Sequence, residues 1–119
     1  MLELLTMHAT VYLLTGEMGA GKTHFVKSMY SQATSPTFTI VNYYEPNIYH
    51  LDLYRIEEEE EYLHLGLEEI LTGDNVVFIE WAQKLPSHYL GLIKGLIKNV
   101  KIVKLENDER QIIVHEHRR

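Results

Sequence analysis

Short apolar runs alternate with polar turns along the chain, and most runs are rich in β-branched and aromatic residues. The run Val76–Ile79 is apolar at every position, which is typical of a buried parallel strand. Two runs flank a turn at residues 45–47, so residues 38–54 are predicted to form a β-hairpin. Strands are expected at residues 10–15, 38–44, 48–54, 76–79, 101–105 and 111–114, the last two as a second hairpin.

Helical patterns lie between these strands. Residues 22–30 contain neither Gly nor Pro, and residues 56–71 carry apolar side chains suited to burial, with Gly66 as a break or a close contact. Residues 84–98 are ambiguous, and residues 1–9 fit a strand or one helical turn. This order predicts an α/β fold in which helices flank a mixed, partly parallel sheet. A length of 119 residues suits one domain covering the whole chain.

Charge, cysteine content and the length of the apolar runs argue against several classes of protein. The chain carries a net charge of −6 with neutral histidines, so overall charge does not favour nucleic-acid binding, and a partner is expected to hold any RNA. Cysteine is absent, which excludes disulfides, thiol catalysis and zinc–thiolate sites. No apolar run is long enough for a membrane span, and the first residues lack the basic region of a signal peptide. A cytoplasmic protein without membrane association is expected.

The run of glutamates and the histidines each allow a structural and a functional interpretation. Glu57–Glu61 is a run of acids that fits a solvated helix start, where the helix dipole favours carboxylates, or a docking surface for a basic partner. The seven histidines are scattered, and the pair in His115–His117 fits a strand end better than a metal site.

The segment Gly16–Thr23 reads Gly-Glu-Met-Gly-Ala-Gly-Lys-Thr and matches the phosphate-binding pattern G-x-x-x-x-G-K-[S/T]. An apolar run precedes it and a helical pattern follows it, which is the context that the motif requires. Glycines let backbone N–H groups approach a phosphate, and these groups form an anion cradle with the helix N-terminus. The expected ligand is a nucleoside triphosphate with Mg²⁺, because an ordinary glycine-rich turn would not explain Lys-Thr at this offset.

Roles within the loop follow from the chemistry of its side chains. Lys22 is expected to reach the β- and γ-phosphates, and the Thr23 hydroxyl is expected to be a magnesium ligand. Ala20 leaves room for the phosphate chain. Glu17 cannot help to hold phosphate, so we expect it to face solvent or to bond to the sugar or a partner. Nucleotide contacts are assigned to Glu17, Met18, Gly19, Ala20, Gly21, Lys22 and Thr23.

A phosphate loop needs an acid at the carboxyl edge of the sheet. Glu80 ends the buried apolar run, where a carboxylate can hold the magnesium shell or orient a water on the γ-phosphate. Asp52 is predicted to be a second acid of the site, with an ion pair to Arg55 as the alternative. Catalytic roles are therefore assigned to Glu80 and Asp52, and metal binding to Thr23 and Glu80.

Three further residues are assigned to the nucleotide site. Trp81 is the only tryptophan, and it either fills the core or covers the nucleotide. Thr37 lies between the first helix and the hairpin, where switch loops contact the γ-phosphate in GTPase-like proteins. Arg110 and Arg55 are the candidates for an arginine that stabilises the transition state. Neither looks like a dedicated arginine finger, so slow intrinsic hydrolysis is expected.

Five strings occur in a fixed order along the chain. They are Gly16–Thr23, Ser35–Phe38 (Ser-Pro-Thr-Phe), Tyr49–Arg55 (Tyr-His-Leu-Asp-Leu-Tyr-Arg), Leu65–Leu67 (Leu-Gly-Leu) and Ile79–Trp81 (Ile-Glu-Trp). Together they strongly resemble the TsaE (YjeE) family, bacterial ATPases that assist threonylcarbamoyladenosine formation at position 37 of tRNAs reading ANN codons. The resemblance runs from about Thr10 to Gln83, with weaker agreement in the last hairpin.

The resemblance implies a single-domain P-loop NTPase with a mixed sheet, ATP and Mg²⁺ as cofactors, and weak ATPase activity. It also implies association with TsaD and TsaB, the transferase and its dimerisation partner, with tRNA reached only through them. Asp52 matches a functionally important aspartate, Trp81 matches the tryptophan beside the acid, and Ser35–Phe38 matches a switch-like loop. Arg110 loosely matches an arginine near the nucleotide.

Two departures from the family pattern affect the nucleotide base. The family usually begins with a longer segment that frames the base, and the stretch between Lys22 and Ser35 is usually longer than it is here. Low nucleotide affinity without a partner is therefore expected.

The residues leave two other functions open. A small-molecule P-loop kinase would use the same loop, although such kinases usually carry an arginine-bearing lid and an acceptor pocket. A non-catalytic, nucleotide-gated binding module would share every site residue with a slow ATPase.

Overall fold

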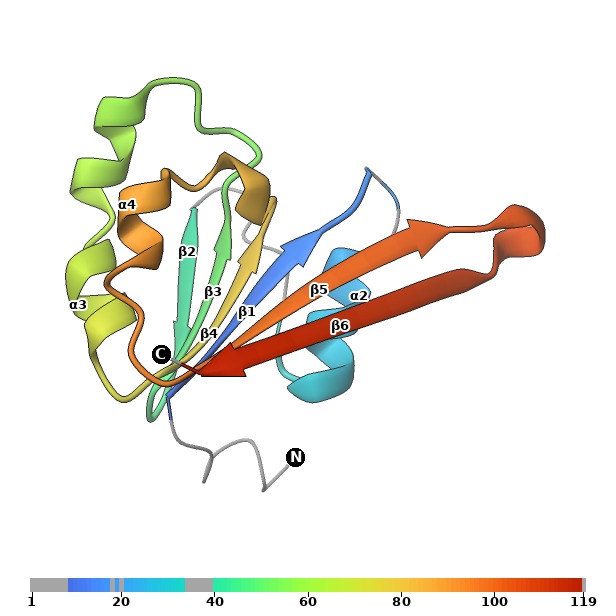
Figure 1. The fold of residues 1–119 in the computed structure, drawn as a ribbon, viewed down its shortest axis with the longest axis horizontal. Coiled ribbons are helices and arrows are strands. Elements are labelled where there is room, and N and C mark those ends of the chain that lie inside the picture. The colour runs from blue at the N-terminus through green and yellow to red at the C-terminus, as the bar shows by residue number, and fades with distance from the viewer. Residues whose placement is uncertain (1–8, 18, 20, 34–39, 119) are drawn as a thin grey trace.

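The computed structural model describes residues 9–17, 19, 21–33 and 40–118. One mixed sheet of six strands, in the order β2-β3-β4-β1-β5-β6, forms the framework (Figure 1). The strands are β1 (Thr10–Thr15), β2 (Val41–Tyr44), β3 (Ile48–Asp52), β4 (Val76–Glu80), β5 (Leu96–Lys104) and β6 (Arg110–Arg118). Neighbours among β3, β4, β1 and β5 pair parallel, and β2 and β6 pair antiparallel at the two edges. The predicted α/β fold with a mixed, partly parallel sheet is confirmed.

Helices cover both faces of this sheet (Figure 1). The helices are α2 (Lys22–Met29), α3 (Leu67–Thr72), α4 (Ser87–Leu90) and the 3₁₀ helices η1 (Glu59–His64), η2 (Ala82–Lys84) and η3 (Glu106–Asp108). Successive side chains of a strand point to opposite faces. Leu13 of β1 therefore packs with η1, α3 and α4, whereas Leu14 packs with α2. Among the described residues, every helix is too short or too polar to cross a lipid bilayer.

The central strand β4 is buried at all five positions, as the apolar run predicted, and it includes Glu80. Residues 56–71 were expected to form one helix, but they form η1 and α3. Gly66 separates the two with a left-handed backbone (φ 73°), so the predicted break lies where the pattern placed it. The ambiguous segment 84–98 contains the end of η2, all of α4 and the start of β5.

The last hairpin is longer than the sequence pattern indicated. Pairing runs from Leu96 with Arg118 to Lys104 with Arg110, and the hairpin projects beyond the rest of the sheet (Figure 1). Alternation in β6 is hard to see in the sequence because eight of its nine residues are exposed. The stretch 115–117 lies in β6, which confirms its interpretation as part of a strand.

Lys84 anchors the loop that follows β3. Its Nζ donates hydrogen bonds to the carbonyl oxygens of Tyr54 (2.8 Å) and Ile56 (2.6 Å), and its own carbonyl accepts one from the Tyr62 hydroxyl (2.7 Å). Because bonds from a charged donor are stronger than neutral ones, Lys84→Met is expected to lower the free energy of unfolding by about 2 kcal/mol.

Urea denaturation followed by circular dichroism measures this change. The exposed Lys94 offers a matched control, since Lys94→Met should alter the free energy of unfolding by less than about 0.5 kcal/mol. Equal effects of the two substitutions would contradict the anchoring role of Lys84.

Candidate functional site

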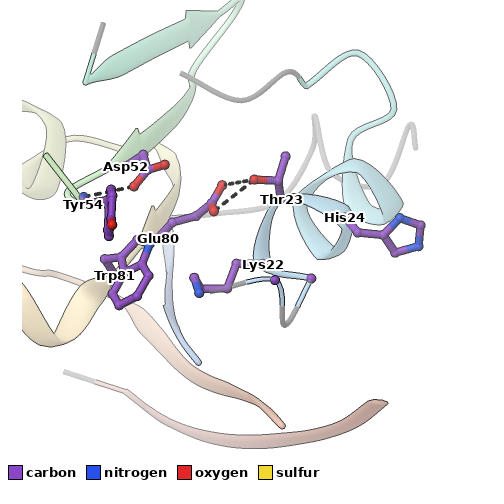
Figure 2. Close-up of a pocket in the computed structure, with 9 residues that line it drawn as sticks. Lys22, Thr23, His24, Asp52, Tyr54, Glu80 and Trp81 are labelled. Atoms are coloured by element: carbon purple, nitrogen blue, oxygen red, sulfur yellow. Dashed lines mark hydrogen bonds between the residues drawn. The ribbon is translucent and has the colours of Figure 1, made fainter. Parts of the chain in front are cut away.

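The carboxyl ends of β1, β3 and β4 meet at one edge of the sheet. The register places Glu80 beside Leu14 on one side and beside Asp52 on the other, so the two predicted acids are neighbours. A cleft of about 320 Å³ opens at this edge (Figure 2). Its lining consists of Gly19, Gly21, Lys22, Thr23, His24, Asp52, Tyr54, Glu80 and Trp81. The structure thus brings most of the predicted site residues together.

The glycine loop connects β1 to α2 at this cleft. Gly21 stands immediately before α2 with φ 106°, a left-handed conformation that glycine adopts without strain. No described side chain caps the N-terminus of α2, so its first N–H groups remain available to an anion. Met18, Ala20 and Thr37 lie outside the described residues.

Lys22 is held at the head of the cleft and is only 5% exposed. Its Nζ donates hydrogen bonds to the carbonyl oxygens of Gly16 (2.7 Å) and Glu17 (3.0 Å) and lies 4.2 Å from the centre of the Trp81 ring. Burial lowers the pKa of Lys22, and the carboxylates of Glu80, Asp52 and Glu17 oppose this shift. Glu17 itself is exposed, one of the two positions expected for it.

Glu80 joins the sheet to the start of α2. The Thr23 hydroxyl lies 3.0 Å from Oε1 and 2.8 Å from Oε2 of this carboxylate, which is therefore aimed at the loop. The Nε2 of His50 lies 2.5 Å from the same Oε2. Glu80 is 3% exposed, and these partners offset the cost of burying its charge. Sequence reasoning missed His50, although alternation along β3 places it on the same face as Asp52.

Asp52 forms a short turn rather than the alternative ion pair. Its Oδ1 accepts a hydrogen bond from the backbone N–H of Tyr54 (3.0 Å), and within the described structure it makes no ion pair with Arg55, which is exposed. Burial raises the pKa of Asp52, the bond from Tyr54 opposes this shift, and the Glu80 carboxylate adds to it. Asp52 therefore holds a proton more readily than an ordinary aspartate.

Trp81 packs against the core, which is one of its two expected roles, and it also lines the cleft. Its left-handed backbone (φ 58°) turns the chain sharply after β4. Its side chain packs against the core cluster that includes residues of α3 and α4. The Lys22 ammonium lies over the Trp81 ring, and the centre of the Tyr54 ring is 5.0 Å from that of Trp81. Trp81 is therefore part of the cleft wall as well as part of the core.

Arg110 reaches the glycine loop from the far end of the chain. It begins β6, and its Nη2 donates to the carbonyl oxygen of Gly19 (3.3 Å) while its Nη1 donates to that of Asp108 (3.0 Å). A second cavity of about 630 Å³ lies between α2 and the β5–β6 hairpin, next to the cleft. Its lining consists of Gly21, His24, Phe25, Ser28, Ile102, Arg110 and Ile112.

The oxygen atoms that face the cleft suit a Mg²⁺ ion that is also bound by the phosphates of a nucleotide. The described residues contain no group of three or more His, Asp or Glu side chains that could form a metal cage. Mg²⁺ instead takes one or two protein oxygens together with phosphate oxygens and waters. The Thr23 hydroxyl and the Glu80 carboxylate provide oxygen atoms of the type that Mg²⁺ takes.

Comparison with known proteins identifies the family. The family model described as "Threonylcarbamoyl adenosine biosynthesis protein TsaE" matches residues 1–112. The chain belongs to the TsaE family. The resemblance seen in the sequence is thereby confirmed, and the P-loop fold goes with it.

Members of the TsaE family from several bacteria are similar over most of the chain. The tRNA threonylcarbamoyladenosine biosynthesis protein TsaE of Rickettsia prowazekii is 35% identical over 88% of this chain and 76% of its own length. The protein of the same name from Bacillus subtilis is 36% identical over 86% of this chain and 66% of its own length. The crystal structure of Bacillus subtilis YdiB aligns with a TM-score of 0.66 at 29% identity, covering 99% of this chain and 75% of that one.

Proposed function

We propose that this chain binds ATP and Mg²⁺ and hydrolyses ATP slowly, as a component of the machinery that forms N6-threonylcarbamoyladenosine at position 37 of tRNA. The observation that carries the proposal is the bonding of the Thr23 hydroxyl to both oxygens of Glu80 beside the buried Lys22. This group supplies oxygen ligands for Mg²⁺ and a cation for phosphate at one point. The names of the family and its relatives supply the link to tRNA modification.

Each residue of the cleft has a separate part in this proposal. Lys22 binds the β- and γ-phosphate oxygens in exchange for the loop carbonyls that it now contacts. Thr23 and Glu80 would hold Mg²⁺, and the ion would supply positive charge to the phosphate oxygens. Asp52, whose pKa burial raises, orients the attacking water and takes up its proton.

The nucleotide base and sugar are assigned to the cavity between α2 and the hairpin. This cavity adjoins the cleft through Gly21 and His24, and the side chains of Phe25 and Ile112 give it an apolar wall. Arg110 also lines this cavity and bonds to Gly19 of the glycine loop, close to the expected path of the phosphates. The loop residues Met18 and Ala20 and the switch residue Thr37 are assigned to nucleotide contacts by their sequence alone.

Slow hydrolysis and dependence on partners follow from the same arrangement. Arg110 donates to the loop backbone and Arg55 is exposed, and neither of these described arginines lines the cleft beside Lys22. We propose that homologues of TsaD and TsaB bind this chain and complete its activity. The net charge of −6 fits tRNA that is bound by these partners rather than by this chain.

The proposal is tested by measuring phosphate release from ATP by the chain alone and with the TsaB and TsaD homologues of its own organism. Slow Mg²⁺-dependent release is expected from the chain alone, faster release is expected with the partners, and the yield of modified tRNA should depend on ATP. Turnover that the partners leave unchanged would count against a role in that machinery.

A further inference from the structure

His50 is a polar side chain inside an apolar layer. It shares with Ile48 and Asp52 the face of β3 that α2 covers, because alternate residues of a strand lie on one face. The register places it opposite Phe78 of β4, and it is 0% exposed. An imidazole in such surroundings costs desolvation free energy unless it is hydrogen-bonded.

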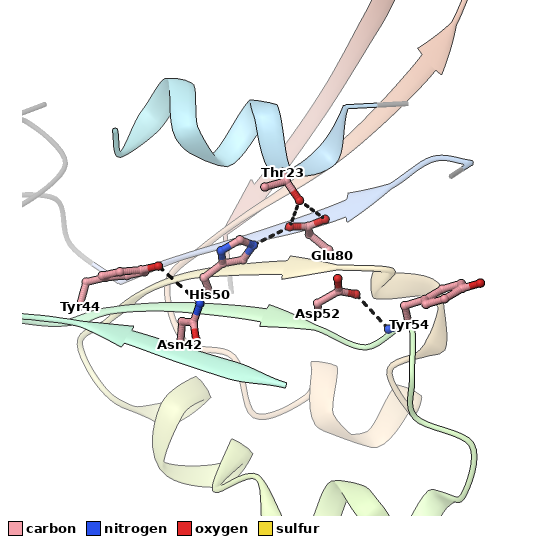
Figure 3. Close-up of polar contacts among 7 residues, drawn as sticks. All are labelled: Thr23, Asn42, Tyr44, His50, Asp52, Tyr54 and Glu80. Atoms are coloured by element: carbon pink, nitrogen blue, oxygen red, sulfur yellow. Dashed lines mark hydrogen bonds and ion pairs between the residues drawn. The ribbon is translucent and has the colours of Figure 1, made fainter. Parts of the chain in front are cut away.

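The two ring nitrogens of His50 have different environments. Nε2 lies 2.5 Å from Oε2 of Glu80, whereas Nδ1 is buried with no hydrogen-bond partner in the described part of the chain (Figure 3). An ionised carboxylate only accepts hydrogen bonds, so Nε2 carries the proton and donates it. The bond to Glu80 is therefore the contact that offsets the burial of this ring.

Thr23 holds the same carboxylate from another element of the fold. The Thr23 hydroxyl bonds to both oxygens of Glu80, so the carboxylate lies between a residue of α2 and a residue of β3 (Figure 3). A glutamate side chain has several rotatable bonds, and a carboxylate that serves a cation needs neighbours that fix its orientation. His50 supplies one of these two supports from the floor of the site.

We propose that His50 is a positioning residue, which orients Glu80 through Oε2 for the cation shared with Thr23. The inference rests on the Mg²⁺-dependent activity proposed above. His50 is not among the residues that line the cleft, and its loss is expected to weaken the use of Mg²⁺ much more than nucleotide binding. Nucleotide binding depends mainly on Lys22 and the glycine loop.

Three substitutions separate the hydrogen-bond donor from the volume of the side chain. In His50→Gln, the amide places an N–H near the position of Nε2. In His50→Asn, the amide reaches only the position of Nδ1, and His50→Leu has no donor. Tyr12→Phe is the matched control, because it removes from the same layer a buried hydroxyl that has no hydrogen-bond partner among the described residues.

The first measurement is the Mg²⁺ dependence of ATP turnover. His50→Leu and His50→Asn are expected to need roughly 10- to 100-fold more Mg²⁺ for half-maximal turnover. His50→Gln and Tyr12→Phe should stay close to the wild type, and calorimetry in EDTA should show ATP binding unchanged in all four variants. A wild-type Mg²⁺ requirement in His50→Leu would overturn the role of His50 and leave the proposed function standing. Absence of Mg²⁺-dependent turnover in the wild-type protein would instead reject the proposed function, and this role with it.

A second measurement uses the nucleotide-free protein and does not depend on activity. Imidazole ¹H–¹⁵N correlation spectra are expected to show the His50 proton on Nε2, with the signal identified by its loss in His50→Gln. Glu80→Ala should shift this signal, and Lys27→Ala, at an exposed position of α2, should not. A proton on Nδ1, or a signal that Glu80→Ala leaves in place, would overturn the proposal even if His50→Leu failed to fold.

Discussion

Lys22→Ala is expected to abolish ATP binding, with a loss of affinity of roughly 100-fold or more. Lys22 is the buried cation of the cleft, and its ammonium already lies within hydrogen-bond distance of two loop carbonyls. Phosphate oxygens would replace these weaker acceptors, and alanine offers neither charge nor donor. The fold should persist, because the hydrogen bonds that Lys22 loses are local to the glycine loop. Isothermal titration calorimetry measures the affinity directly.

Lys27→Ala is the control for this substitution. Lys27 lies in the last turn of the same helix and is exposed, so its removal should leave the affinity for ATP unchanged. Trp81 provides a second signal, because Lys22 lies over its ring and Trp81 is the only tryptophan of the chain. ATP should change the fluorescence of the wild-type protein but not that of Lys22→Ala. Retained affinity in Lys22→Ala would contradict the phosphate-loop assignment.

Glu80→Ala is expected to keep nucleotide binding but to lose Mg²⁺-dependent hydrolysis, with turnover lowered by roughly 100-fold or more. The substitution removes the carboxylate that meets Thr23 and leaves Lys22 and the glycine loop intact. Calorimetry in EDTA measures the retained binding, and phosphate release at varied Mg²⁺ measures the loss. Because the change also leaves His50 without its buried partner, thermal denaturation and the more conservative Glu80→Gln should accompany it.

Asp52→Asn is the informative comparison for Glu80→Ala. Asp52 lies beside Glu80 in the register and is the second acid of the cleft, so unchanged turnover in Glu80→Ala would move the catalytic role to Asp52.

The yield of modified tRNA with Glu80→Ala separates an ATPase that must hydrolyse ATP from a module that only needs to bind it. Full yield without hydrolysis would favour a module that ATP binding alone controls.

The sequence predicted the parts of the site that local patterns encode. Strand β1, the glycine loop and the start of α2 adjoin one another in the chain, and the apolar run of β4 points to Glu80 at its end. The placement of Glu80 beside the glycine loop followed from the rule that parallel strands bring their carboxyl ends to one edge. These predictions needed only periodicity and one motif.

Other features depend on contacts between distant residues, which no local pattern records. A histidine within a β-prone run gives no sign that its ring will lie under α2 against Glu80. Lys84 resembles any surface lysine until the loop after β3 folds against it. The length of β6 was underestimated because its stability comes from pairing with β5 rather than from burial of its own side chains.

The placement of β1 between β4 and β5 has a consequence for synthesis of the chain. The phosphate-binding motif is complete once Thr23 has been added to the growing chain, yet β1 then has neither of its neighbours. Thr10 pairs with Val76 on one side and with Leu96 on the other, so both contacts close long stretches of chain. Non-local parallel pairing of this kind forms slowly. A nascent chain therefore carries the motif long before it can bind a nucleotide, and the nucleotide can stabilise only a chain that already includes β4 and β5.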